Sequence, residues 1–200
     1  SVNELVDMNF LIPGYQRGYR WEELQVTELL NDLYAFIKTK GYYCLQPLVV
    51  RSSNDIELFR KRAGEILEQN ASDSLVTDIH KLMEESSYWE VIDGQQRLTT
   101  IYIILKILNE DIRLFNIRYV TRKRSQEFLS DIINKTKEEA DDNIDFFHMY
   151  RVRESVRTWI EETSRKDKDV RQIMTDTLLN RVKFIWYESF GEDPVEVFTR

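Results

Sequence analysis

The sequence predicts a helix-rich α+β protein. Three prolines and six glycines in 200 residues are too few turn formers for a sandwich of many short strands. Apolar residues make up 42% of the chain and aromatic residues 12%, which is enough for one large core. Short runs rich in β-branched and aromatic residues alternate with longer segments in which apolar residues recur at helical spacing.

The first part of the chain begins with a short strand, a loop and an amphipathic helix. Residues 10–12 are a short apolar run, and PGYQRGYRW (13–21) is a loop because it combines a proline, two glycines and alternating aromatic and basic residues. Apolar residues at helical spacing predict a helix over 22–38, and the aromatic and β-branched run 42–50 predicts a buried strand. Residues 52–87 are polar with two helix-like pieces, and they predict a helical insertion.

Residues 88–92 (YWEVI) have strand chemistry, and apolar spacing from Leu98 to Leu108 predicts a helix after Gly94. A further strand is expected at 112–120. Beyond Arg124 the same spacing predicts three helices, at 127–133, 144–161 and 170–179. A last apolar run predicts a strand at 182–188.

These elements divide the chain into two regions. Residues 1–124 form the expected core with its insertion, and residues 125–200 form a helical extension with a returning strand. The first residue is serine, and the extension ends inside an amphipathic pattern without a helix stop signal. We therefore expect a fragment that is truncated at its C-terminal end.

Composition argues against several classes of function. The formal net charge of −7 disfavours a surface that coats nucleic acid, because such binding depends on Lys and Arg neutralising phosphates. The single Cys44 excludes an internal disulfide, and the distant His80 and His148 cannot supply a metal cluster alone. No apolar run approaches the roughly 18 residues that span a bilayer, and the start lacks a signal-peptide pattern. A cytoplasmic protein is expected.

The segment VIDGQQR places an acidic residue, a glycine, two amides and an arginine where a strand meets a helix. The first helical N–H groups have no partner within the helix, and together with the helix dipole they favour an anion. Gly94 lacks the Cβ that would keep a phosphate from the backbone, and Arg97 carries a planar donor suited to phosphate oxygens. Asp93 at the N-cap position can cap the helix or hold magnesium, whereas Gln95 and Gln96 can donate to phosphate or orient a water.

Two interpretations of this corner stay open. An Asp-Gly pair before a helix is also an ordinary capped turn, and Arg97 could be the structural partner of a carboxylate. Three charge-assisted hydrogen bonds at about 1.5–3 kcal/mol each contribute roughly 5–9 kcal/mol. Association costs of about 4–15 kcal/mol could cancel this gain. A nucleotide would therefore need a second set of contacts.

The loop 13–21 can provide that second set, because aromatic faces stack on bases and interleaved donors bind base edges or phosphates. The side chains concerned are Tyr15, Tyr19, Trp21, Gln16, Arg17 and Arg20. The alternative is a loop whose aromatic residues pack into the core and whose arginines are exposed. A basic island without acids also occurs over 112–126, and its candidates for contact with DNA or phosphate are Arg122, Lys123 and Arg124. Ordinary solvated arginines at a strand end are the alternative there.

Taken together, IPGYQRGYRW and VIDGQQRLTT resemble the signature pair of the bacterial domain family found in GmrSD-type restriction enzymes. Two later stretches are also similar to blocks of that family, YVTRKRSQEFL (119–129) and VKFIWYESFGEDPVEVFTR (182–200). The resemblance covers nearly the whole chain. It implies a ParB/sulfiredoxin-like small mixed sheet with flanking helices, followed by the helix-rich region.

The resemblance also implies a function, because the DGQQR segment of that family is implicated in binding and hydrolysing nucleoside triphosphates. It implies catalytic roles for Asp93, Gln96 and Arg97, with Asp93 as a magnesium ligand. It implies nucleotide binding by Gly94, Gln95, Tyr15, Gln16, Arg17 and Trp21. One departure from the family is Gln46, which stands where relatives often carry a small glycine.

Proteins of this family resemble two-part proteins, in which a second region, often an HNH-type nuclease, follows the domain described by these motifs. We therefore expect an NTP-binding, NTP-hydrolysing regulatory domain of a DNA-targeting restriction or anti-phage protein. It would contact DNA through the full-length protein and would not be a nuclease by itself. The alternative is a non-catalytic DNA-binding or protein-docking module of the same fold.

Overall fold

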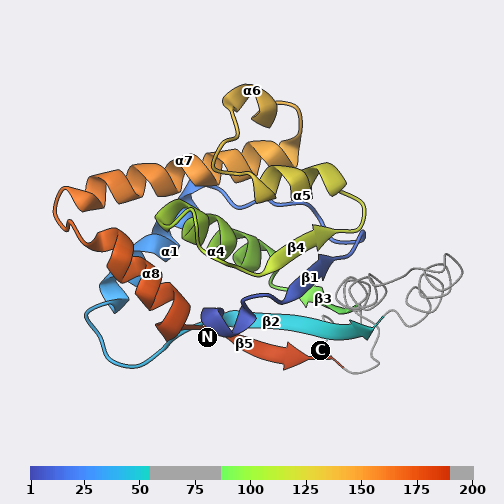
Figure 1. Ribbon diagram of the computed structural model, residues 1–200, viewed down its shortest axis with the longest axis horizontal. Helices are drawn as coiled ribbons and strands as arrows, with labels where there is room; N and C mark the ends of the chain where they lie inside the picture. Colours follow the sequence, from blue (N-terminus) through green and yellow to red (C-terminus); the bar gives the residue numbers. More distant parts are fainter. Residues whose placement is uncertain (55–86, 190–200) are drawn as a thin grey trace, which may run out of the picture.

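The computed structural model describes residues 1–54 and 87–189, which form a mixed five-stranded sheet with helices packed against it (Figure 1). The strands follow the spatial order β4-β1-β3-β2-β5. Their bounds are Asn9–Ile12 (β1), Tyr43–Asn54 (β2), Ser87–Asp93 (β3), Asn116–Tyr119 (β4) and Val182–Glu188 (β5). The expected α+β class is confirmed. Nearly all of the predicted helical insertion, residues 55–86, lies outside the described residues.

Strand direction explains why the chain crosses the sheet. β1 runs parallel to both β3 and β4, β2 is antiparallel to β3, and β5 is parallel to β2. Parallel strands of one sheet need a crossover connection, and α4 (Gln95–Leu108) makes it from β3 to β4, which lie on either side of β1. The register of β2 shifts between Leu45 and Pro47, where it pairs with β5. Proline lacks an N–H donor, so a bulge is a place where a strand tolerates it.

The helix α4 lies between the sheet and the long helix α7 (Figure 1), and it also contacts α8. It is buried on all sides, in agreement with an apolar pattern that leaves almost no polar face. The remaining helices are η1 (Val2–Leu5), α1 (Glu23–Phe36), α5 (Lys123–Ser130), α6 (Lys137–Ala140), α7 (Ile144–Ser164) and α8 (Val170–Arg181). None of the helices in the described ranges has both the length and the apolar character that crossing a membrane requires.

Two expected elements differ from the structure in length. The strand expected at 112–120 covers only Asn116–Tyr119, because β1, its one partner among the described strands, has four residues and the ladder cannot extend past them. The helix expected at 127–133 begins earlier, at Lys123, and ends at Ser130. The strand β5, predicted in the helical extension, pairs with β2 of the core region, so one sheet includes strands from both regions.

Arginines bind the carbonyl ends of helices. Arg171 Nη1 donates to Ile107 O (2.7 Å) and Leu108 O (3.3 Å) at the end of α4. Arg181 Nη1 donates to the carbonyl of Ile37, the C-cap residue of α1, at 3.2 Å, and its Nη2 donates to Thr39 O at 2.6 Å just beyond the helix. The last carbonyl groups of a helix receive no hydrogen bond from within the helix. These guanidinium groups therefore donate to them and connect α8 to two other helices.

Candidate functional site

The corner between β3 and α4 is built on a glycine. β3 ends at Asp93, Gly94 is the N-cap residue with φ of 95°, and α4 begins at Gln95. This corrects the expectation that Asp93 occupies the N-cap position, because Asp93 still pairs with Val49 in the sheet. A Cβ at Gly94 would lie 3.0 Å from Pro47 O, so both the left-handed conformation and the space favour glycine.

The loop 13–21 lies over this corner, and the two motifs line one pocket of about 330 Å³. We call it the motif pocket. Its lining residues are Tyr15, Gln16, Arg17, Trp21, Ile92, Asp93, Gly94, Gln95, Gln96 and Arg97. Every residue to which the resemblance assigns nucleotide binding or catalysis therefore lies in one place, whereas Tyr19 and Arg20 of the loop do not line the pocket. No side chain caps the N-terminus of α4, and the first helical N–H groups have no intrahelical acceptor, so this end of the helix favours an anion.

The amides of Gln95 and Gln96 attach the loop to the helix. Gln95 Nε2 donates to Arg17 O at 2.6 Å, and Gln96 Nε2 donates to Gly18 O at 3.0 Å. Gln96 Oε1 also accepts the backbone N–H of Arg20 at 2.8 Å. Both side chains thus bind loop backbone. The predicted role of Gln96 in orienting a water stays a prediction.

Gln16 makes the reciprocal connection from the loop to β3. Its Nε2 donates to Ile92 O at 2.8 Å and to Val91 O at 2.5 Å. Its own carbonyl oxygen accepts Arg122 Nη2 at 2.8 Å. Gln16 therefore holds the loop against the last residues of β3, immediately before the corner.

Arg97 extends from the first turn of α4 toward β2. Its Nη1 donates to Gln46 Oε1 at 2.6 Å and its Nη2 donates to Pro47 O at 2.8 Å. Nη2 lies 3.6 Å from Asp93 Oδ2, and Nε is buried without a hydrogen-bond partner. Gln46, which departs from the family pattern, is exposed, and its side-chain oxygen is an acceptor for this guanidinium.

Asp93 supplies one carboxylate at the rim of the motif pocket, with a side chain that is 47% exposed. The part of the chain that the structure describes contains no cluster of three His, Cys, Asp or Glu residues that could hold a metal. Magnesium prefers oxygen ligands, keeps several waters and commonly binds through one or two carboxylates together with substrate phosphates. A single carboxylate fits that mode of binding.

The outer rim of the pocket carries the aromatic and basic side chains of the loop. Tyr15 is 61% exposed, and its hydroxyl donates to Glu90 Oε1 at 3.4 Å. Trp21 is half-buried against the core. Arg17 is exposed, and its guanidinium pairs with no side chain among the residues that the structure describes. Tyr19, in contrast, is buried, and its hydroxyl lies 2.7 Å from Thr100 Oγ1. The loop thus has both expected behaviours, since Tyr19 packs into the core.

The three basic candidates near 122–124 do not act together. Arg122 is directed inward, with its Nε 3.4 Å from Asp145 Oδ2. Lys123 is exposed at the start of α5. Arg124 Nη2 lies 3.2 Å from Asp142 Oδ2 on the surface. Sequence reasoning missed Asp145, because an acidic residue in the first turn of a helix is common and nothing marks it as buried.

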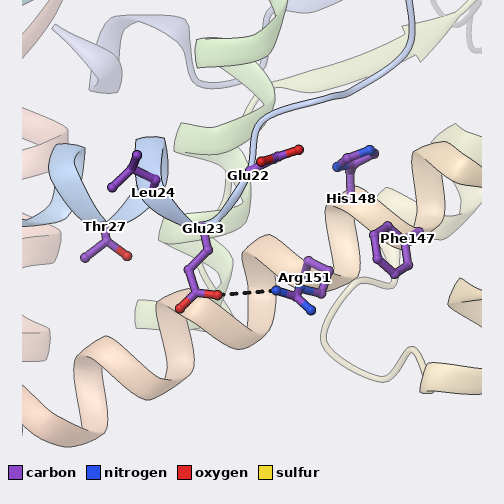
Figure 2. Close-up of a pocket in the computed structure, with 7 residues that line it drawn as sticks. All are labelled: Glu22, Glu23, Leu24, Thr27, Phe147, His148 and Arg151. Atoms are coloured by element: carbon purple, nitrogen blue, oxygen red, sulfur yellow. Dashed lines mark hydrogen bonds and ion pairs between the residues drawn. The ribbon is translucent and has the colours of Figure 1, made fainter.

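A larger pocket, of about 600 Å³, lies between the start of α1 and the first turns of α7 (Figure 2). Glu23 and Arg151 face each other there, with Arg151 Nη2 3.4 Å from Glu23 Oε2. His148 stands on α7 beside Phe147, as a partly exposed helix residue. The carboxylates of Glu22 and Glu23 would repel a phosphate, and the charge of Arg151 is already paired. This pocket is therefore a poor match to the predicted ligand.

The protein is an α+β domain in which the loop motif and the corner motif enclose the N-terminus of the central helix α4. Hydrogen bonds between residues 75 to 78 positions apart in the sequence join the two motifs. The family model of the GmrSD restriction endonuclease N-terminal domain matches residues 2–200. The chain belongs to this family of restriction-type proteins. A search of curated proteins found no match.

Proposed function

We propose that the motif pocket binds a nucleoside triphosphate and hydrolyses it with magnesium, as a regulatory domain of a restriction or anti-phage protein. The observation that carries the proposal is that both motifs line one 330 Å³ pocket at the N-terminus of α4. A pocket of this size is near the lower end of small-molecule sites, which span roughly 300–1,000 Å³. Restriction-type proteins act on DNA, so DNA would be contacted by the full-length protein.

The phosphates would lie on the first N–H groups of α4, where the left-handed Gly94 opens the backbone. Arg17 is the cation best placed to reach them, because no described side chain competes for its charge. The exposed ring of Tyr15 and the half-buried Trp21 offer faces for the base. This arrangement would supply contacts to both the phosphates and the base, and the second set is needed because the cost of association could cancel the phosphate contacts alone.

Asp93 would hold the magnesium ion together with the phosphates, and the ion would neutralise charge that develops on them. Arg97 lies close enough to Asp93 to orient its carboxylate. Contact between Arg97 and a phosphate would require exchange of its present bonds to β2. Its buried, unpartnered Nε is consistent with a side chain that has unused donor capacity.

Titration calorimetry with ATP, GTP, CTP and UTP, each with and without magnesium, tests the proposal. At least one nucleotide should bind more tightly than about millimolar, and Arg17→Ala should weaken it roughly tenfold or more, since a charge-assisted bond contributes about 1.5–3 kcal/mol. Arg165→Ala is the matched control, because Arg165 is exposed at the end of α7, away from the pocket. If no nucleotide binds, the proposed site is wrong.

The same preparation tests whether this domain cuts DNA. We expect no metal-dependent nicking of plasmid DNA by residues 1–200 with magnesium or manganese, because the described residues hold no cluster of metal ligands. Nicking that Asp93→Ala abolishes would make this domain the nuclease and would contradict the proposed division of roles.

A further inference from the structure

Asp145, in the first turn of α7, is a buried carboxylate in contact with three side chains from other elements. Its Oδ1 accepts Arg20 Nη1 at 2.6 Å, and its Oδ2 lies 3.3 Å from Ser125 Oγ and 3.4 Å from Arg122 Nε. The side chain is 4% exposed. A buried charge is tolerated only with such partners, and it becomes costly when one of them is removed.

Both arginines connect Asp145 to the loop 13–21. Arg20 belongs to the loop, and its Nη1 also donates to the carbonyl of Tyr19 at 2.5 Å. Arg122 Nη2 donates to the carbonyl of Gln16 at 2.8 Å. One carboxylate therefore fixes two guanidinium groups, and these groups bind loop backbone at Tyr19 and at the pocket residue Gln16.

Gly18 shows how closely the loop approaches this carboxylate. A Cβ at Gly18 would lie 2.0 Å from Asp145 Oδ1, closer than any real contact. Gly18 does not adopt a positive φ, so space and not backbone conformation accounts for glycine here. Its carbonyl oxygen accepts Gln96 Nε2. The loop is thus held on one side by the amides of the corner and on the other side by Asp145.

We infer that Asp145 is a positioning residue for the motif pocket, which fixes the loop 13–21 in the conformation that places Tyr15, Gln16, Arg17 and Trp21 around the N-terminus of α4. Asp145 does not line the pocket and acts through Arg20 and Arg122. The identity of the ligand rests on the proposed function, whereas the attachment of the loop does not.

Hydrogen exchange of backbone amides tests the attachment without any ligand. Asp145→Asn keeps the shape of the side chain but removes the charge that two arginines share. We expect exchange within residues 14–21 to rise at least tenfold, while exchange in the core of α4 (101–105) stays unchanged. Asp7→Asn is the matched control, because Asp7 also binds an arginine, Arg113, at 2.6 Å but is exposed.

A second variant perturbs the same contact from the loop and leaves all charges in place. Gly18→Ala should also raise exchange within 14–21, because its Cβ must displace the carboxylate. The double variant Gly18→Ala with Asp145→Ala has no carboxylate for the new Cβ to displace, so its loop should exchange no faster than the faster of Gly18→Ala and Asp145→Asn. The inference would be overturned if the loop exchanged at the same rate in Asp145→Asn, in Gly18→Ala and in the original protein. A rise of the same size in the loop and in the core of α4 would also overturn it.

Nucleotide calorimetry separates this inference from the proposed function. If the original protein binds a nucleotide, Asp145→Asn should weaken binding at least tenfold and Asp7→Asn should not. Unchanged affinity in Asp145→Asn would overturn the positioning role. If the original protein binds no nucleotide, the proposed function fails, and the exchange measurements still decide whether Asp145 fixes the loop.

Discussion

Replacing Gln96 by methionine separates two roles for a side chain at the centre of the motif pocket. Methionine has nearly the same shape and helix propensity as glutamine and carries no charge, so it removes only the two hydrogen bonds. Gly18 O would lose its donor at 3.0 Å, and the N–H of Arg20 would lose its acceptor at 2.8 Å. The loop would then be held to α4 by Gln95 and by the contact between the Tyr19 hydroxyl and Thr100 Oγ1.

The expected loss of stability follows from these two bonds. An orphaned buried polar group costs about 1–3 kcal/mol, and both groups are only partly buried, so the lower end applies to each. The free energy of unfolding should fall by about 2–3 kcal/mol. At about 2–4 °C per kcal/mol for a chain of this size, Tm should fall by roughly 4–12 °C.

Urea unfolding measures the loss of stability, calorimetry measures nucleotide binding, and an assay of phosphate release measures hydrolysis. Gln172→Met is the matched control, because Gln172 is exposed on α8 and its single bond to Asp176 should contribute no more than about 0.5 kcal/mol. A Gln96→Met protein with unchanged stability would refute the attachment of the loop by Gln96. A variant that binds nucleotide normally but hydrolyses it slowly would instead support the role of Gln96 in orienting water.

Gly94→Ala should destabilise the protein by about 2–3 kcal/mol in urea unfolding, because an L residue at φ of 95° costs about 1–2 kcal/mol and its Cβ would also contact Pro47 O. Gly41→Ala, at φ of 101° with open space around it, should show only the conformational part, and equal losses in the two variants would exclude the steric part. Burial raises the pKa of Tyr119 to about 12, so the folded protein favours the neutral phenol. The stability that Tyr119 contributes should therefore be complete below pH 10 and decline as the pH rises toward 12. Tyr119→Phe should make that decline shallower in unfolding experiments at pH 9–12, and an unchanged decline would count against the burial of this hydroxyl. If α5 contacts DNA, Lys123→Ala with Arg124→Ala should lower the salt slope of binding in gel shifts by about one for each lost phosphate contact. A slope that does not change would remove these two residues from the DNA interface.

Local patterns in the sequence determined most of the elements. The strand chemistry of 88–92 and the apolar spacing after Gly94 predict β3, α4 and the corner between them, and the structure places that corner within one residue. These signals are local, since they depend on a period of two or 3.6 residues and on the conformational freedom of glycine. The same reasoning predicts an anion site at the corner, which stays a prediction, and it pairs this corner with the loop motif, which lines the same pocket in the structure.

The lengths and pairings of the strands depended on the tertiary structure. β4 is short because β1, the strand it pairs with in the described part of the chain, is short, and β5 joins the sheet through β2, more than 130 residues earlier in the chain. The indole of Trp186 packs edge to face on Trp89 and adds a contact across the sheet that periodicity does not predict. Pairing of distant strands depends on complementary surfaces and not on the local pattern of either strand.

The hydrogen bonds of the site were also decided by the tertiary structure. Gln95, Gln96 and Gln16 were predicted as ligand contacts, and in the structure their amides bind backbone carbonyl groups of the facing segment. Every residue carries the same backbone carbonyl group, so the sequence contains no mark of which one an amide will meet. For the same reason Asp145 was indistinguishable from an ordinary acidic residue at a helix start. Its burial against Arg20 and Arg122 exists only where α5, α7 and the loop come together, so the sequence determined which residues form the pocket and the packing of distant segments determined how they are held.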